Sequence, residues 1–150
     1  MSVFRGKTAL ITGATGGIGT ALAKNLAKEG CSLLLVCRSA TKCATLLSQL
    51  ERYNVDIKAL WCDFNNESDV TKMISSLEEK TVDILINNAG YFPIKSILES
   101  SIKDYDNCFN INVKVPFVLS RTLGEKMCTN KWGRIVNIGS SSSYNGSGVT

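Results

Sequence analysis

Histidine is absent from this chain of 150 residues, and its six cysteines form no C-x-x-C pair. Common zinc sites combine closely spaced cysteines with histidine or further cysteine ligands, so none of their patterns is present. The missing histidine also removes the base that normally activates a nucleophilic serine. We therefore expect neither a metal site nor a histidine-activated serine.

Long hydrophobic runs are also missing. No segment approaches the roughly 20 apolar residues that a membrane-spanning helix needs, and Met1 to Lys7 lacks the apolar core of a signal peptide. The 17 basic and 13 acidic residues are spread along the chain without a block of like charge, and the net charge is +4. These features predict a cytoplasmic protein with neither a membrane partner nor a nucleic-acid partner.

The cysteines are interpreted as free thiols in a reducing compartment. Cys37 and Cys62 fall in apolar strand-like runs, where cysteine behaves as a small hydrophobic residue. The other four are Cys31, Cys43, Cys108 and Cys128.

The chain has two prolines, 44% hydrophobic residues and no repeat or evident linker. A chain of this length buries about 68–70% of its unfolded surface, so residues 1–150 are expected to form one domain.

Apolar strand-like runs alternate with helical stripes along the whole chain. Strands are expected at Ala9–Ile11, Ser32–Cys37, Ile57–Cys62, Val82–Ile86 and Arg134–Ile138. Helical spacing is found between them, in Ile18 to Leu26, Ala40 to Leu50, Val70 to Leu77 with Asn66 as its cap, and about Ser101 to Lys126. This order predicts an α/β fold, a doubly wound parallel sheet of the Rossmann type.

A glycine-rich run follows the first expected strand directly and leads into the first helix. It extends from Thr12 to Gly19 and reads TGATGGIG. Glycine accepts positive φ and has no Cβ to hold a ligand away from the backbone. The free N–H groups at the start of the helix then favour a pyrophosphate. The alternative is a strand-to-helix turn without a ligand.

Polar residues follow each of the five expected strands. They are the glycine run after the first strand, Arg38-Ser39, Asp63-Phe64, Asn87-Asn88-Ala89-Gly90 and Gly139-Ser140-Ser141. In a parallel sheet the carboxyl ends of the strands lie at one edge, where ligands bind. The sequence therefore predicts that these groups meet in one crevice.

In this order, the motifs resemble the classical short-chain dehydrogenase/reductase family over the whole chain. Gly13, Gly17 and Gly19 match its T-G-x-x-x-G-x-G loop, and Asn87 to Gly90 spell its N-N-A-G run. The resemblance implies catalytic roles for Asn112 and Ser140. It also implies a cofactor site formed by Gly13, Thr15, Gly17, Ile18, Gly19, Arg38, Asp63, Phe64, Asn88, Ala89 and Gly90.

The glycine loop fits a second branch of the same superfamily. Gly13, Gly16 and Gly19 match the T-G-x-x-G-x-x-G spacing of extended members, because residues 16 and 17 are both glycine. The N-N-A-G run favours the classical branch. Ile18 favours it too, since extended members more often have an aromatic residue before the last glycine.

The end of the second strand indicates the cofactor. A carboxylate there would bind the ribose hydroxyls of NAD and repel the 2′-phosphate of NADP. Arg38 stands there instead, and its forked, permanently charged guanidinium matches a phosphate. We expect NADP(H) in preference to NAD(H). The alternative is an exposed arginine that interacts only with solvent.

The resemblance implies a tyrosine that donates a proton to the substrate carbonyl and a lysine four residues later that lowers its pKa. Both belong after Ser140. The tyrosine that follows Ser140 is Tyr144, but residue 148 is glycine. We interpret Tyr144 and Ser141 to Ser143 as a loop near the substrate mouth. We expect a truncated form or fragment of a longer reductase, whose fifth strand becomes a sheet edge prone to pairing.

These observations predict an NADP(H)-dependent oxidoreductase that interconverts a carbonyl and an alcohol. Among members of the family, 3-oxoacyl thioester reductases resemble the chain most. The expected partners are a small-molecule substrate, whose apolar wall includes Phe92 and Ile94, and further copies of the full-length protein. The alternative is a catalytically silent NADP(H)-binding module without the tyrosine and lysine.

Overall fold

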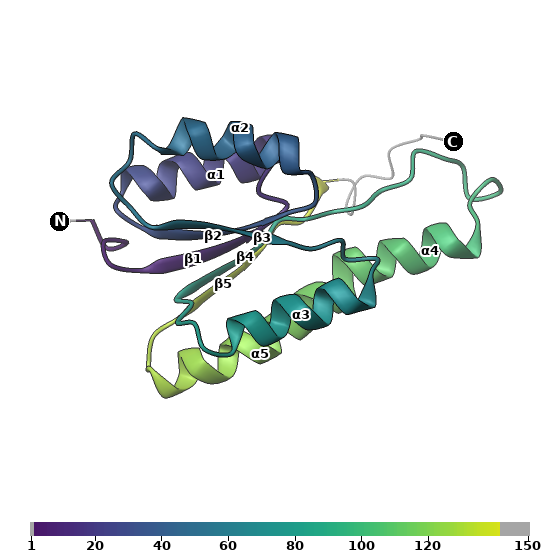
Figure 1. Cartoon of the computed structure of the whole chain (residues 1–150). Helices are drawn as coiled ribbons and strands as arrows, with labels where there is room; N and C mark the ends of the chain where they lie inside the picture. The colour runs from purple at the N-terminus through teal and green to yellow at the C-terminus, as the bar shows by residue number, and fades with distance from the viewer. Residues whose placement is uncertain (1, 142–150) are drawn as a thin grey trace.

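Five parallel strands form one sheet in the computed structural model, which describes residues 2–141 (Figure 1). The spatial order β3-β2-β1-β4-β5 reverses direction between β1 and β4. Such a reversal opens a crevice outside the carboxyl ends of the strands. The doubly wound sheet is confirmed, with strand ends within two residues of the expected ones. The strands are β1 (Thr8–Thr12), β2 (Ser32–Cys37), β3 (Ile57–Trp61), β4 (Ile84–Asn87) and β5 (Arg134–Asn137).

Helices cover both faces of the sheet. The helices α1 (Gly17–Lys28) and α2 (Ala40–Leu50) lie on one face, and α3 (Glu67–Leu77) and α5 (Val115–Thr129) lie on the other (Figure 1). In β1, Ala9 and Ile11 pack with the first pair, whereas Leu10 packs with the second pair. Because successive side chains point to opposite faces, a strand covered on both faces is a continuous apolar run.

The region from about Ser101 to Lys126, expected to be mostly helical, consists of three helical pieces. The structure has α4 (Ile102–Phe109), a π-helical turn η1 (Asn110–Lys114) and then α5. Pro116 gives a physical reason, because it has no N–H to donate to the carbonyl of residue 112. The expected, mostly helical region is therefore confirmed, and the π-helical turn within it is a detail that the apolar spacing did not predict. The proline was the signal in the sequence that marked the break.

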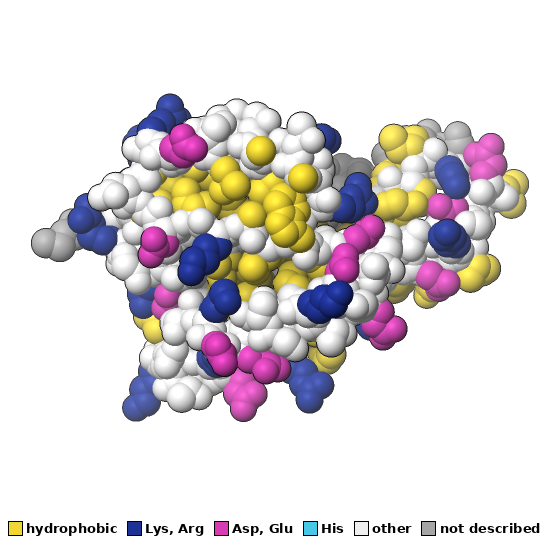
Figure 2. Space-filling model, viewed as in Figure 1, with side chains coloured by type: hydrophobic (Ala, Val, Ile, Leu, Met, Phe, Trp, Pro, Cys, Tyr) yellow, Lys and Arg dark blue, Asp and Glu magenta, His cyan; other side chains and the backbone are white. Residues whose placement is uncertain are grey.

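Two strands form the edges of the sheet. Among the described residues β5 pairs only with β4, and all four of its residues are exposed. Within residues 2–141, the fifth strand is therefore an edge of the sheet. At the other edge, the side chain of Trp61 in β3 is exposed, and Figure 2 shows apolar side chains gathered on this face between α2 and α3.

Three further expectations concern cysteines, membrane spans and the end of the chain. All six cysteines are free, and Cys37 and Cys62 are buried as expected. Within residues 2–141 no helix has the length and apolar character needed to cross a membrane. Tyr144 and the serines at 142 and 143, interpreted as a loop, lie outside the described residues.

Candidate functional site

A cavity of about 510 Å³ opens at the carboxyl ends of β1 to β4. Four of the five expected polar strand ends therefore meet in one crevice, and the described residues after β5, 138–141, do not line it. Of the eleven expected cofactor-binding residues, Gly19 alone is not in the lining. The cavity is lined by Gly13, Thr15, Gly16, Gly17, Ile18, Val36, Arg38, Cys62, Asp63, Phe64, Asn88, Ala89, Gly90, Tyr91 and Ile111.

Two glycines of the turn are required by close packing within the protein. Gly13 has a φ of +61°, and a β-carbon there would lie 2.9 Å from Ala89 Cα. At Gly19 a β-carbon would lie 2.8 Å from Ala14 Cα. Both approaches are too short for a side chain. Gly19 therefore allows α1 to approach the turn closely, which explains why it is buried behind the cavity wall rather than in it.

Gly17 differs from these two glycines. A β-carbon at Gly17 would meet no protein atom within 4 Å, and the residue lines the cavity. Ile18 beside it is 58% exposed, so it does not belong to the buried stripe expected for α1. The protein therefore leaves the space in front of Gly17 open, and only a ligand would require the absence of a side chain there.

The start of α1 also faces the cavity with unpaired donors. The helices α2, α3 and α4 are preceded by the N-cap residues Ser39, Asn66 and Ser101, whose side chains accept hydrogen bonds from backbone N–H groups. In contrast, the N-cap of α1 is Gly16, which has no side chain to accept such a bond, and the first turn of α1 contains no acidic residue. Its N–H groups and positive dipole end thus suit an anion.

A hydroxyl that the sequence analysis did not single out joins the glycine turn to β4. Thr12 Oγ1 accepts hydrogen bonds from the backbone N–H groups of Asn88 and Ala89, both at 2.9 Å. Asn88 returns the contact, since its Nδ2 donates to the carbonyls of Thr12 (2.9 Å) and Gly13 (3.1 Å). The amide of Asn88 therefore holds the turn in place. The sequence signal that could have indicated this contact is the threonine at the end of β1.

The ends of β2 and β3 form the other side of the cavity. Arg38 is exposed and takes part in neither of the two ion pairs between described residues. Asp63 is half-buried, and its Oδ1 accepts the N–H of Asn65 at 3.0 Å. Phe64 is buried behind it, and its carbonyl accepts from Asn110 Nδ2. A permanent positive charge and a carboxylate thus lie at the same end of the crevice.

Asn112 lies beside the cavity rather than in its lining. Its Oδ1 accepts the N–H of Tyr91 at 2.9 Å, and its Nδ2 donates to the carbonyl of Tyr91 at 2.8 Å. Both Tyr91 and Ile111 line the cavity. The π turn η1 therefore places the expected catalytic asparagine against the segment that follows β4. Ser140 is exposed, three residues after the end of β5.

Cys62 is the thiol in the cavity wall. Burial, followed by the charges of Asp69 and Asp63, raises its pKa to about 12. The thiol stays protonated at neutral pH and is not a nucleophile. Residues 2–141 contain no cluster of histidine, cysteine and carboxylate side chains that could hold a metal ion.

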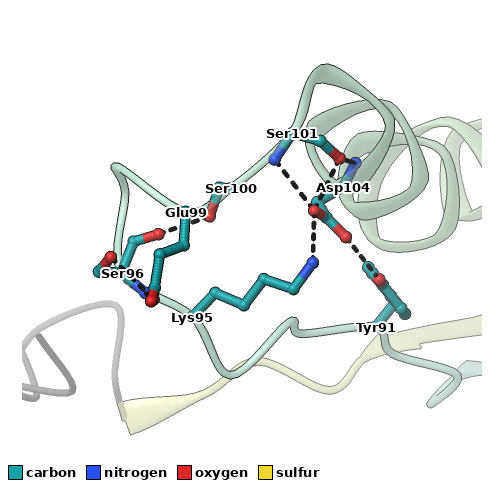
Figure 3. Close-up of polar contacts among 7 residues, drawn as sticks. All are labelled: Tyr91, Lys95, Ser96, Glu99, Ser100, Ser101 and Asp104. Atoms are coloured by element: carbon teal, nitrogen blue, oxygen red, sulfur yellow. Dashed lines mark hydrogen bonds and ion pairs between the residues drawn. The ribbon is translucent and has the colours of Figure 1, made fainter.

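The chain contains a Y-x-x-x-K spacing that the sequence analysis missed, at Tyr91 and Lys95. It precedes Ser140 instead of following it, and it lies in an irregular segment that includes Pro93. The two side chains do not contact each other in a catalytic arrangement. Tyr91 Oη donates to Asp104 Oδ1 at 3.2 Å, and Lys95 Nζ donates to Asp104 Oδ2 at 2.8 Å (Figure 3).

Comparison with known proteins identifies the family. A model of the short chain dehydrogenase family matches residues 7–150. The chain belongs to the short-chain dehydrogenase family. The parallel sheet, the glycine turn and the N-N-A-G segment therefore have the arrangement expected of a nucleotide-binding oxidoreductase family.

Three proteins illustrate what the chain is similar to. The 3-oxoacyl-[acyl-carrier-protein] reductase FabG of Rickettsia bellii is 37% identical over 89% of this chain and 53% of its own length. A short-chain dehydrogenase from Sphingobium yanoikuyae in complex with NADPH has a TM-score of 0.89 and 29% identity, over 94% of this chain and 56% of its own. An NAD⁺-bound xylitol dehydrogenase has a TM-score of 0.85 and 30% identity, over 96% of this chain and 56% of its own. The chain thus spans about half the length of these proteins.

Proposed function

We propose that residues 1–150 form the NADP(H)-binding domain of an oxidoreductase that interconverts a carbonyl and an alcohol. The observation that carries this proposal is the cavity at the carboxyl ends of β1 to β4, whose lining includes both Gly17 and Arg38. The uncapped start of α1 suits the pyrophosphate, and the guanidinium suits the 2′-phosphate.

The residues of the cavity fit a dinucleotide. The open space in front of Gly17 would receive the pyrophosphate, whereas Asp63 and Phe64 would flank the adenine. The segment from Asn88 to Tyr91 would border the nicotinamide. When bound, NADPH supplies a hydride to the substrate carbon. The protein's contribution is to orient the ring against the substrate and to shield it from water.

Two side chains are proposed to act on the substrate side. Ser140 would polarise the carbonyl by a hydrogen bond, and Asn112, already fixed on the backbone of Tyr91, would position a water. A 3-oxoacyl thioester or a similar ketone is the proposed substrate. Phe92 and Ile94 supply exposed apolar surface for it on the segment after β4.

We further propose that the protein is located in the reducing cytoplasm and that it assembles with a second copy. Exposed apolar residues recur every three or four positions along α4, η1 and α5, and the rings of Tyr105 and Phe109 lie 4.4 Å apart. We refer to this set as the apolar stripe, and a second copy of the chain is proposed to cover it. The stripe consists of Ile102, Tyr105, Phe109, Val113 and Phe117.

The cofactor assignment is tested by replacing Arg38 with alanine and titrating NADPH and NADH by fluorescence. A hydrogen bond to a charged group contributes about 1.5–3 kcal/mol, so its loss should weaken NADPH binding by about 10-fold to more than 100-fold. NADH binding should stay within about twofold, since NADH has no 2′-phosphate. Arg52→Ala, at an exposed arginine outside the cavity lining, is the matched control. Equal effects of R38A on both cofactors would refute the assignment.

A catalytically silent NADP(H)-binding module is the second candidate. It is favoured by the tyrosine and lysine spacing, which is present only at Tyr91 and Lys95, where both side chains contact Asp104. Binding of NADPH without oxidation in the presence of a panel of ketones and 3-oxoacyl thioesters would support the module. Turnover of any of them would support the enzyme.

A further inference from the structure

The segment between β4 and α4, residues 91–100, has little to hold it in place by packing. It forms no helix or strand, and its internal backbone hydrogen bonds are local turns such as Glu99 N to Ser96 O at 3.2 Å. Its large apolar side chains are exposed, with Leu98 at 95% and Ile94 at 79%. Figures 1 and 2 show that the segment and α4 project from the body of the protein. Tyr91 alone packs, partly buried, against the hydrophobic core, so polar contacts must fix the rest of the segment.

These contacts converge on Asp104 in the first turn of α4 (Figure 3). The side chain of Asp104 is 11% exposed, and both carboxylate oxygens accept hydrogen bonds. Oδ1 accepts from Tyr91 Oη, and Oδ2 accepts from Lys95 Nζ as well as from the hydroxyl (2.7 Å) and N–H (3.0 Å) of Ser101. The Lys95 ammonium, followed by the Ser101 donors, holds the pKa of Asp104 well below its usual range. The carboxylate is thus a permanent acceptor at neutral pH.

A single helix face contacts Tyr91 at three points. Asp104, Cys108 and Asn112 are spaced four residues apart, which places them on the same side of the helix. Asp104 binds the Tyr91 hydroxyl, Cys108 Sγ lies 3.7 Å from the Tyr91 carbonyl, and Asn112 binds the Tyr91 N–H and carbonyl. A movement of Tyr91 along this helix face therefore also displaces the Tyr91 N–H and carbonyl, which are the groups that the side-chain amide of Asn112 binds.

We propose that Asp104 is a positioning residue that, through Tyr91 and Lys95, fixes the substrate-side segment 91–99 and the amide of Asn112. This inference rests on the proposed function for its consequence in catalysis. It also assigns a role to the Tyr91 and Lys95 pair. The hydroxyl donates to a carboxylate and the ammonium is paired with the same carboxylate, so the pair holds the segment and is not the proton donor of the reaction.

The first test measures the amide of Asn112 by NMR in the full chain without cofactor. Tyr91→Phe and Asp104→Asn should both shift the Asn112 side-chain resonances. Both should also speed hydrogen exchange in residues 91–99 by about tenfold, as expected from loss of a hydrogen bond to a charged group. The double variant should add little, because the two residues share one contact.

Two control variants separate positioning from helix capping. Ser101→Ala removes the cap and one donor to Asp104 Oδ2 but leaves the Tyr91 contact with Oδ1, so it should lower the unfolding temperature and shift the Asn112 resonances less than Y91F does. Tyr105→Phe removes an exposed hydroxyl on the same helix and should change neither. The proposal is overturned if Y91F and D104N affect Asn112 no more than Y105F does, even where D104N lowers stability. Failure of the wild-type chain to bind NADPH would refute the proposed function and leave this result unaffected.

The second test uses steady-state kinetics wherever the full chain reduces a ketone with NADPH. Y91F should raise KM several-fold and lower kcat by less than about tenfold, because the substrate wall loosens while the proton donor stays intact. A fall in kcat of about 100-fold or more with an unchanged KM would identify Tyr91 as a general acid and overturn the positioning role.

Discussion

Gly17 and Gly19 stand two residues apart in the same turn, yet their replacement by alanine should have opposite effects. At Gly17 a β-carbon meets no protein atom within 4 Å, whereas at Gly19 it lies 2.8 Å from Ala14 Cα and 2.9 Å from Asn88 Nδ2. Gly17→Ala should keep or raise the free energy of unfolding, by at most about 1 kcal/mol from helix propensity. Gly19→Ala should lower it by about 1–3 kcal/mol, because the backbone must move.

The effects on NADPH binding follow from the same geometry. A methyl group at Gly17 stands where the pyrophosphate would approach the start of α1. Loss of one hydrogen bond to a charged group, about 1.5–3 kcal/mol, weakens binding by about 10-fold to more than 100-fold. The assay is fluorescence titration of NADPH, paired with thermal unfolding in which 1 kcal/mol moves the midpoint by about 2–4 °C. Wild-type affinity in G17A, or a loss of stability as large as in G19A, would refute the reasoning.

Three further outcomes are expected. Thr12→Val should lower the free energy of unfolding by about 1–3 kcal/mol in denaturant titrations, because two backbone donors lose their acceptor, while Thr12→Ser should retain most of it. Burial raises the pKa of Cys31 from 9.0 to about 11, so only the unfolded thiol ionises between these values. Stability should therefore fall as pH rises from 9 to 11, by at most about 1.4 kcal/mol per unit for this thiol, and Cys31→Ala should reduce the slope. Phe109→Glu with Phe117→Glu should convert a dimer to a monomer in size-exclusion chromatography, while Val3→Glu, exposed elsewhere, should not.

Much of the sheet and crevice follows from local sequence patterns. Helices cover both faces of the sheet, so both sets of side chains in a strand are apolar. A strand such as the one ending at Cys37 is therefore a continuous apolar run and not an alternation of apolar and polar residues. The polar strand ends meet because parallel strands share one edge. Ten of the eleven expected cofactor residues line the cavity for this reason. Gly19 is the exception, because spacing in a motif does not distinguish a glycine that faces a ligand from one that faces its own helix.

Contacts between distant segments were harder to predict. The hydroxyl of Thr12 acts 76 residues away on Asn88, and nothing local to either residue reveals the pair. The π turn required attention to Pro116, whose missing N–H alters the ladder of a helix that otherwise has good apolar spacing. The role of Asp104 depends on two partners from one irregular segment, Tyr91 and Lys95, and on the N-cap Ser101. The role of two residues with a given spacing, such as Tyr91 and Lys95, therefore cannot be predicted without knowing the structural element in which they lie.

The central claim is that the cavity at the carboxyl ends of β1 to β4 holds NADP(H). The most direct measurement is a titration of ¹⁵N-labelled chain with NADPH, followed by the backbone amide resonances. Binding in the cavity should shift the resonances of residues 15–19, Arg38, Asp63 and Gly90, and NADH should leave Arg38 nearly unchanged. Shifts confined to residues outside the cavity lining, or no saturable shift at all, would contradict the claim.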